Sequence, residues 1–192
     1  LVPVTLPDGT VVSTDDGPRA GTTYDKISQL KPVFRPNGTI TAGNACPLND
    51  GAAAVVIMSD AKAKALGLTP LARIVSTAVT GLSPEIMGLG PIEAIKKALA
   101  NAGKTISDID LVEINEAFAV QVLGSARELG IDEDKLNVSG GAIALGHPFG
   151  MTGARITATL LNNLQTHDKT FGIESMCVGG GQGMAMVVER LS

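Results

Sequence analysis

The stretch Gly140–Arg155, GGAIALGHPFGMTGAR, organises this sequence, because a loop rich in glycine and proline leads directly into a helical pattern. Glycine lets backbone approach backbone or ligand closely, since it lacks a Cβ and can adopt positive φ. His147, one of only two histidines in the chain, sits in the middle of this loop. We therefore expect His147 to be held near a helix N-terminus, where the partial charge is positive.

Strand and helix patterns alternate on both sides of the histidine loop. The order read from residue 71 onward is β-α-β-α-β-α-β-β, which predicts an α/β fold with a largely parallel sheet covered by helices. The expected strands are 71–79, 110–114, 136–139, 171–177 and 183–190, and the expected helices are 91–102, 116–129 and the one after the loop. Ligands of such sheets bind outside the carboxyl ends of the strands. Asn115, the histidine loop and Cys177 each follow a strand, so they are expected to share one edge.

The part before residue 70 is less regular. Residues 1–38 predict a short hairpin with its turn at Asp8-Gly9 and a short helix that Pro32 ends, typical of a covering loop. AAAVVIM, residues 52–58, is apolar at every position, which suits a strand buried on both faces. Ser59 is expected to cap a short helix that Gly67 stops.

Composition narrows the class of protein. The chain has 192 residues, 44% of them hydrophobic and 18% charged, which is enough for a compact core. Its net charge of −4 contains no basic block, so we expect no nucleic-acid partner. No apolar run is long enough for a bilayer and no signal peptide is recognisable, so we expect a cytoplasmic protein that has no membrane partner. In such a protein Cys46 and Cys177 are expected to be free thiols. The first residue is leucine, and the sequence reads as if cut from something longer.

Three loop residues have a chemical and a plainly structural interpretation. His147 is either a general base or oxyanion donor, or a histidine bonded to a backbone carbonyl. Cys177 is either a small buried apolar residue or a thiol beside the N–H groups of the 179–181 glycines, which could form an oxyanion hole. Asn115 is either a helix N-cap or the holder of a water molecule. His167, in a polar turn, is expected to be solvated surface.

Several other site types are excluded by detail. Gly141 and Gly146 have the spacing of a P-loop, but His147-Pro148 follow where Lys and Ser/Thr are required. The glycine run 179–183 leads into a strand and lacks the last glycine of a dinucleotide fingerprint. The two cysteines and two histidines have no zinc-like spacing, so no metal site is expected.

Five segments together resemble the thiolases. They are TAGNACPLNDGAAA (41–54), MGLGP (87–91), NEAFA (115–119), the histidine loop (140–155) and CVGGGQG (177–183), collinear over nearly the whole chain. Within the family, the chain looks most like the bacterial acetyl-CoA acetyltransferase and 3-ketoacyl-CoA thiolase group, and the form GHPFGMTGAR (146–155) is similar to that of actinobacterial members. The resemblance implies a thiolase-like half with a mixed five-stranded sheet between helical layers. It also implies that 1–38 are the tail of a CoA-covering loop domain, 39–68 the last strand and helix of an N-terminal half, and 69–192 the C-terminal domain.

The resemblance also implies a reaction and roles. Thiolases transfer an acyl group between 3-ketoacyl-CoA and CoA through an acyl-cysteine, with coenzyme A as substrate and no other cofactor. His147 would deprotonate the nucleophilic thiol and donate to a first oxyanion hole whose water Asn115 holds. Cys177 would be the acid/base at the α-carbon, and the N–H of Gly179 would serve a second oxyanion hole. Substrate-contacting positions would be Arg19, Ala42, Cys46, Met87, Phe118 and Phe149.

Two departures from the thiolase pattern shape the expected activity. Cys46 stands where many thiolases have a serine, and a thiol is a weaker hydrogen-bond partner. The acyl-accepting cysteine belongs to the N-terminal half, and neither cysteine here lies in its motif. We therefore expect the chain to be inactive alone and to need that half as a partner, with the intact enzyme forming a homodimer or homotetramer. The alternatives are a non-catalytic acyl-CoA-binding scaffold and a decarboxylating ketoacyl synthase, which normally uses two site histidines, whereas His167 lies outside any matching motif.

Overall fold

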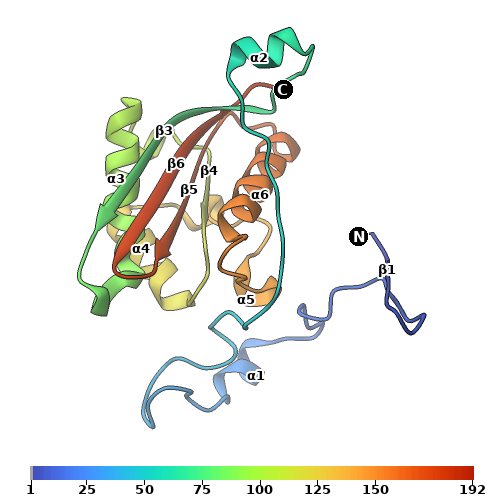
Figure 1. The fold of residues 1–192 in the computed structure, drawn as a ribbon. Coiled ribbons are helices and arrows are strands. Elements are labelled where there is room, and N and C mark those ends of the chain that lie inside the picture. Colours follow the sequence, from blue (N-terminus) through green and yellow to red (C-terminus); the bar gives the residue numbers. More distant parts are fainter. Residues whose placement is uncertain (1) are drawn as a thin grey trace.

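A computed structural model describes residues 2–192, and its elements alternate much as the sequence predicts (Figure 1). The α-helices are α1 (Tyr24–Ser28), α2 (Asp60–Ala65), α3 (Gly90–Ala102), α4 (Ala119–Leu129), α5 (Ala142–Leu145) and α6 (Thr152–Thr166). Short 3-10 helices are η1 (Pro84–Leu89), η2 (Ile106–Asp108) and η3 (Glu133–Lys135). The strands are β1 (Val4–Thr5), β2 (Val11–Val12), β3 (Ala72–Gly81), β4 (Leu111–Ile114), β5 (Phe171–Val178) and β6 (Gln182–Arg190).

A mixed sheet in the order β3-β6-β5-β4 forms the centre of the fold. β6 pairs antiparallel with both β3 and β5, whereas β4 pairs parallel with β5 in the register Glu113↔Glu174. Because β4 and β5 run the same way, the residues that follow them emerge at one edge of the sheet. This is the arrangement expected for Asn115 and Cys177.

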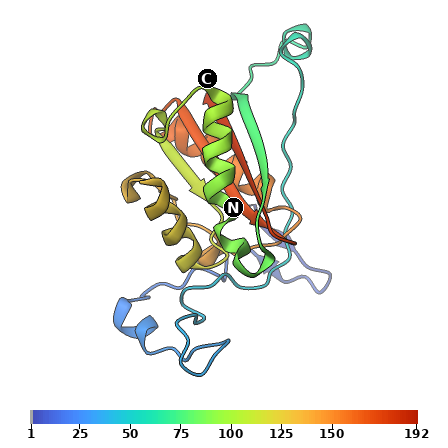
Figure 2. The same ribbon diagram turned by 90° about the vertical axis from the view of Figure 1, so that its left-hand side faces the viewer.

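Helices cover both faces of this sheet. On one face, α3 and α4 bury residues such as Ile95, Ala98 and Val122 against Val112 and Ile173. On the other, α6 buries Leu160 and Leu164 against Leu111 and Val188. Figures 1 and 2 show the sheet between these two layers. The helix after the histidine loop is thereby fixed to the sheet by its own apolar stripe.

The fifth strand expected at Leu136–Ser139 is not formed. In the described residues, Leu136 makes one isolated parallel bridge with Val112. The next residue, Asn137, has φ of 47°, outside the strand region. Its carboxamide accepts from the N–H of Ile114 at 2.8 Å and donates to the C=O of Ile114 at 2.9 Å. A side-chain amide therefore satisfies the edge of β4, and the sheet has four strands rather than five.

The expectation that 52–58 is a doubly buried strand is also wrong for this chain. The run is extended but unpaired within the part that the structure describes, and each of its residues is exposed. Val56 and Ile57 are 85% and 72% exposed. The run is not part of the four-stranded sheet, and Val55 and Met58, the least exposed of its large side chains, are still 40% and 37% exposed.

The predicted hairpin and the predicted capped helix are confirmed, whereas the helix expected to run up to Pro32 already ends at Ser28. β1 and β2 pair antiparallel around the turn at Asp8-Gly9, and Ser59 caps α2 by accepting from the N–H of Lys62 at 3.2 Å. This segment lies mostly outside the packed sheet and helices (Figure 2). Among residues 2–192, none of the helices has the length and apolar character needed to cross a bilayer.

Candidate active site

Asn115 and Cys177 lie at the carboxyl ends of neighbouring parallel strands. The backbone N–H of Asn115 donates to the C=O of Ser175 at 3.0 Å, two residues before Cys177. Both side chains are buried, Asn115 at 1% exposure and Cys177 at 8%. The expectation that these two loops share one edge is confirmed by this register.

Gln121, in the first turn of α4, connects the two residues directly. Its Nε2 donates to the backbone C=O of Asn115 at 3.2 Å, and its Oε1 accepts from the Sγ of Cys177 at 3.5 Å. Gln121 is itself only 6% exposed. The thiol therefore points toward the turn that carries the asparagine, and its proton has a defined acceptor.

The histidine loop is held against the same turn by Glu116. The carboxylate of Glu116 accepts from Nδ2 of Asn137 at 3.0 Å and from the N–H of Ile143, in α5, at 3.1 Å. Gly146 has φ of +95° and lies against the side chain of Asn49, where a Cβ would clash. Glu116 and Gly146 thus fix the path of the chain up to His147.

The hydrogen bonds of His147 define which ring nitrogen is free. Thr152 Oγ donates to the C=O of Pro148 at 3.0 Å and lies 2.7 Å from Nδ1 of His147. The hydroxyl of Thr152 therefore engages Nδ1 in either tautomer of the ring, and Nε2 is the ring nitrogen that this contact leaves open. Burial, and secondarily the charge of Arg155, lower the pKa of His147, so the ring is neutral at pH 7 and can act as a base.

A buried charged cluster lies beneath Asn115, on the α6 face of the sheet. Arg155 is within 3.4 Å of Oε1 of Glu113 and donates to Oδ1 of Asn115 at 3.4 Å. Glu174, beside Glu113 in the sheet, accepts from the hydroxyl of Thr157 at 2.9 Å. Burial raises the pKa of Glu113 to about 8 and that of Glu174 to about 7, although Arg155 opposes both shifts.

Cys177 and the glycine turn after it complete the edge. Burial raises the pKa of the Cys177 thiol, with a smaller contribution from nearby Cys46, so the thiol is protonated at neutral pH. Gly179 is exposed in the turn between β5 and β6. Gly181 has φ of +85°, and a Cβ there would meet the backbone of Leu82 and Pro84. The turn is therefore packed against η1.

The residues predicted to contact substrate are placed unequally. Cys46 lies beside the site, since its N–H donates to the C=O of Ala117 at 3.0 Å and burial raises its pKa. Phe118 packs edge-to-face on Phe34, with ring centroids 6.0 Å apart. Phe149 lies 4.9 Å from the ring of His147 and is 72% exposed.

The other three substrate positions are less fixed by contacts. Met87 is half-buried in η1, which packs on the start of α4 near Gln121. Arg19 and Ala42 are exposed in the N-terminal segment. Contact with a substrate remains a prediction for all six residues.

Four residues that sequence reasoning left without a role organise this site: Glu116, Gln121, Thr152 and Arg155. Gln121 lies one position before Val122 on the inner side of α4, where a polar residue among apolar ones was a usable signal. Thr152 and Arg155 are three residues apart at the start of α6. Thr152 contacts the imidazole of His147, and Arg155 contacts the carboxamide of Asn115. No cluster of three or more metal-ligating side chains occurs in residues 2–192.

Comparison with known proteins identifies the family. The chain is 56% identical over 182 residues to the acetyl-CoA acetyltransferase of Escherichia coli, covering 95% of this chain and 46% of that protein. The crystal structure of the Bacillus anthracis acetyl-CoA acetyltransferase superposes with a TM-score of 0.95 at 50% identity, covering 100% of this chain and 49% of that one. Human mitochondrial 3-ketoacyl-CoA thiolase in complex with CoA gives a TM-score of 0.90 at 45% identity, covering 98% and 48%.

The chain spans about half the length of these relatives. Residues 1–61 match the family described as "Thiolase, N-terminal domain", and residues 68–190 match "Thiolase, C-terminal domain". The finer division at 38 and 68 remains a prediction. The second match covers more than half of the sequence, and the chain belongs to the thiolase family.

Proposed function

We propose that this chain supplies the acid/base part of a thiolase active site, for acyl transfer between a 3-ketoacyl-CoA and coenzyme A, with no other cofactor. The observation that supports it is that Gln121 bonds both the thiol of Cys177 and the backbone C=O of Asn115 at one sheet edge, while α6 contacts the carboxamide of Asn115 through Arg155 and holds His147 through Thr152. Folding alone does not require a thiol, a carboxamide and a basic imidazole nitrogen at the same edge.

Each side chain has a role that its surroundings support. His147, neutral and with Nδ1 anchored on Thr152, would take the proton of a nucleophilic thiol through Nε2. The carboxamide of Asn115 would hold the water of a first oxyanion hole. Cys177, kept protonated by burial, would donate its proton to the α-carbon of the departing enolate. The N–H of Gly179, in the exposed turn, would stabilise the enolate oxygen.

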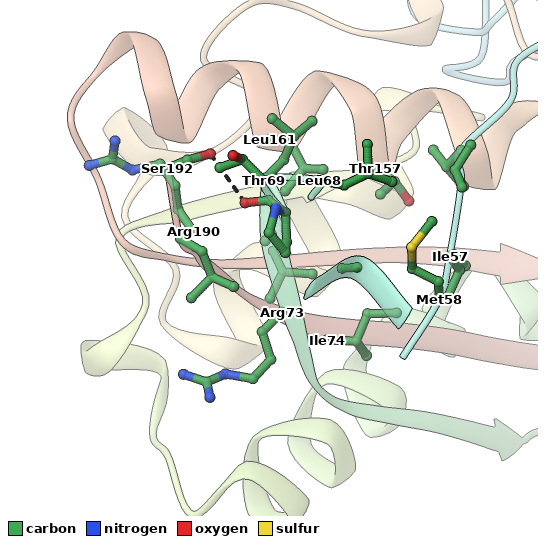
Figure 3. A pocket seen from close by; sticks show the side chains of 18 of the residues that line it. Ile57, Met58, Leu68, Thr69, Arg73, Ile74, Thr157, Leu161, Arg190 and Ser192 are labelled. Atoms are coloured by element: carbon green, nitrogen blue, oxygen red, sulfur yellow. Dashed lines mark hydrogen bonds between the residues drawn. The ribbon is translucent and has the colours of Figure 1, made fainter. Parts of the chain in front are cut away.

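The nucleophilic cysteine is proposed to lie in the other part of a thiolase, bound to this chain. A cavity of about 820 Å³ lies between the exposed run 54–58, α2, α6 and the edge of the sheet. In Figure 3, Ile57 and Met58 face this space from one side, and Thr157 and Leu161 of α6 face it from another. Apolar side chains exposed on this scale favour a protein partner. A homodimer or homotetramer of the whole enzyme in the cytoplasm is proposed with it.

The proposal can be tested by supplying the N-terminal half from a related thiolase. The N-terminal half of the Escherichia coli acetyltransferase would be fused to this chain, and thiolysis of acetoacetyl-CoA followed. Cys177→Ala and His147→Ala should each lower kcat/KM at least about a thousand-fold, because each removes a proton-transfer group.

His167→Ala is the matched control for His147→Ala, since His167 is exposed at the end of α6. It should leave kcat/KM within about twofold of the parent. A folded fusion that binds acetoacetyl-CoA without turnover would contradict the proposal and favour a scaffold. Turnover by the 192-residue chain alone would contradict the need for a separate nucleophile.

A further inference from the structure

The carboxamide of Asn115 is half anchored. Its Oδ1 accepts from the guanidinium of Arg155 at 3.4 Å, while within residues 2–192 nothing accepts from its Nδ2. A buried amide nitrogen without a partner costs about 1–3 kcal/mol, so such groups usually serve a ligand or water. The side chain therefore has one end attached to the protein and one end available to the site.

Arg155 decides which end is which. A guanidinium has only donors, so the group that faces it must be the carboxamide oxygen. If the amide turned over, its NH₂ would face Arg155 and two donors would meet. The position of Arg155 therefore selects the rotamer in which the NH₂ points away from the guanidinium.

Arg155 is itself held by two neighbours. It lies in the first turn of α6, three residues after the Thr152 that anchors His147, and its side chain is 15% exposed. On the sheet side, it is 3.4 Å from Oε1 of Glu113, two residues before Asn115 on β4. Alternate residues of a strand share a face, so Glu113 and Asn115 both point toward α6.

Charge pairing alone does not explain this arginine. Burial raises the pKa of Glu113 to about 8 even though Arg155 lies 3.4 Å from its Oε1, so the guanidinium only partly offsets the cost of burying this carboxylate. Arg155 also leaves its buried Nε without a partner in the part of the chain that the structure describes. Both observations favour a role directed at Asn115 rather than an ion pair optimised for stability.

We propose that Arg155 is a positioning residue, which orients the carboxamide of Asn115 so that its Nδ2 hydrogens face the reacting groups. This inference rests on the proposed function for its kinetic consequences, but not for the geometry. Glu113 serves as the support that keeps the guanidinium under the carboxamide.

The kinetic test uses the fused enzyme. Arg155→Met should lower kcat for thiolysis about 30-fold while KM for acetoacetyl-CoA changes less than about threefold, because orientation in the transition state is lost rather than binding. Arg155→Lys keeps a positively charged donor but lacks the planar, forked guanidinium. Its kcat should be higher than that of Arg155→Met and within about tenfold of the parent. Arg127→Met, which changes an exposed arginine of α4, is the matched control and should have no effect.

A double-mutant cycle separates positioning from a general loss of structure. If Arg155 acts through Asn115, the variant carrying both Asn115→Ala and Arg155→Met should be no slower than Asn115→Ala alone. Effects that multiply, or an Arg155→Met enzyme within threefold of the parent, would overturn the inference.

A second measurement needs no activity and uses the 192-residue chain itself. The side-chain NH₂ signals of Asn115, identified by their loss in Asn115→Ala, should shift in Arg155→Met, shift less in Arg155→Lys, and stay in place in Arg127→Met. Unmoved signals in a folded Arg155→Met chain contradict the inference. An inactive parent fusion would instead count against the proposed function, and the NMR result would still decide the role of Arg155; if Arg155→Met does not fold, the lysine variant decides it.

Discussion

Two short runs, AAAVVIM at 52–58 and LVEI at 111–114, both have the composition of buried strands, and the structure treats them in opposite ways. The first contains no polar residue, yet every one of its side chains is exposed. The second carries a glutamate, yet all four of its side chains are buried, with Glu113 at 2% exposure.

The difference lies in the neighbours that each run finds. LVEI pairs with β5 along its length, its other edge is satisfied by Asn137, and helices cover both of its faces. AAAVVIM has no strand beside it in the described residues. Hydropathy therefore indicates which segment tends toward burial, whereas pairing partners decide whether burial occurs. The buried run is also the one that leads into the site, at Asn115.

The largest expected effect comes from removing the charge of the buried run. Glu113→Gln should stabilise the chain at pH 9 by on the order of 4 kcal/mol, because the pKa of Glu113 is about 8 in the fold against 4.5 in the unfolded chain. The unfolded state loses its proton first as pH rises, so wild-type stability is retained below about pH 4.5 and decreases up to about pH 8. Urea unfolding at pH 4.5, 7 and 9 measures this.

Arg155, Glu116 and Glu174 are the charged groups that act on Glu113. Glutamine keeps an oxygen that can accept from Arg155, so the comparison measures the effect of ionising Glu113 on stability alone. Glu133→Gln, at an exposed position in η3, is the matched control and should leave the pH dependence of unfolding unchanged. A Glu113→Gln chain whose stability falls between pH 4.5 and 9 as steeply as wild type would show that Glu113 ionises freely in the fold.

The next prediction compares the same substitution in the buried run 111–114 and in the exposed run 52–58. Ile114→Ala should cost about 3 kcal/mol of unfolding free energy, because Ile114 is 1% exposed and packed between helix and sheet. Ile57→Ala, the same change at 72% exposure, should cost less than about 0.5 kcal/mol. Chemical denaturation followed by circular dichroism measures both. Equal losses in the two variants would mean that the exposed run is covered in solution.

Most of the fold was predictable because its signals are local. The strand patterns at 71–79, 171–177 and 183–190, Pro91 at the start of α3 and Gly103 at its left-handed end all hold. The errors concern partners distant in sequence. Nothing local to Leu136 shows that the carboxamide of Asn137 will replace a strand, and nothing local to AAAVVIM shows that it will find no neighbour.

The site divides in the same way. Asn115, His147 and Cys177 could be proposed because each follows a strand pattern or stands in a loop of unusual composition. Gln121 and Arg155 could not, since their roles depend on which face of α4 and α6 meets the strand ends. Polar residues at inward helical positions are the available signal, but the sequence alone does not tell which buried group each one will contact.

The smallest of these effects concerns the exposed run as a docking face, and it depends on the proposed second part of the enzyme. Ile57→Asp should weaken binding of the Escherichia coli N-terminal half about 30-fold, or about 2 kcal/mol, because a carboxylate would be buried in an apolar contact. The chain's own unfolding midpoint should not move, since Ile57 lies in solvent there. Ala100→Asp, exposed on α3 at the opposite face of the sheet, is the control and should bind as the parent does. Titration calorimetry on separate halves measures both variants. Undiminished binding by Ile57→Asp would mean that the cavity beside this run is not where the second part docks, even if the fused enzyme is active.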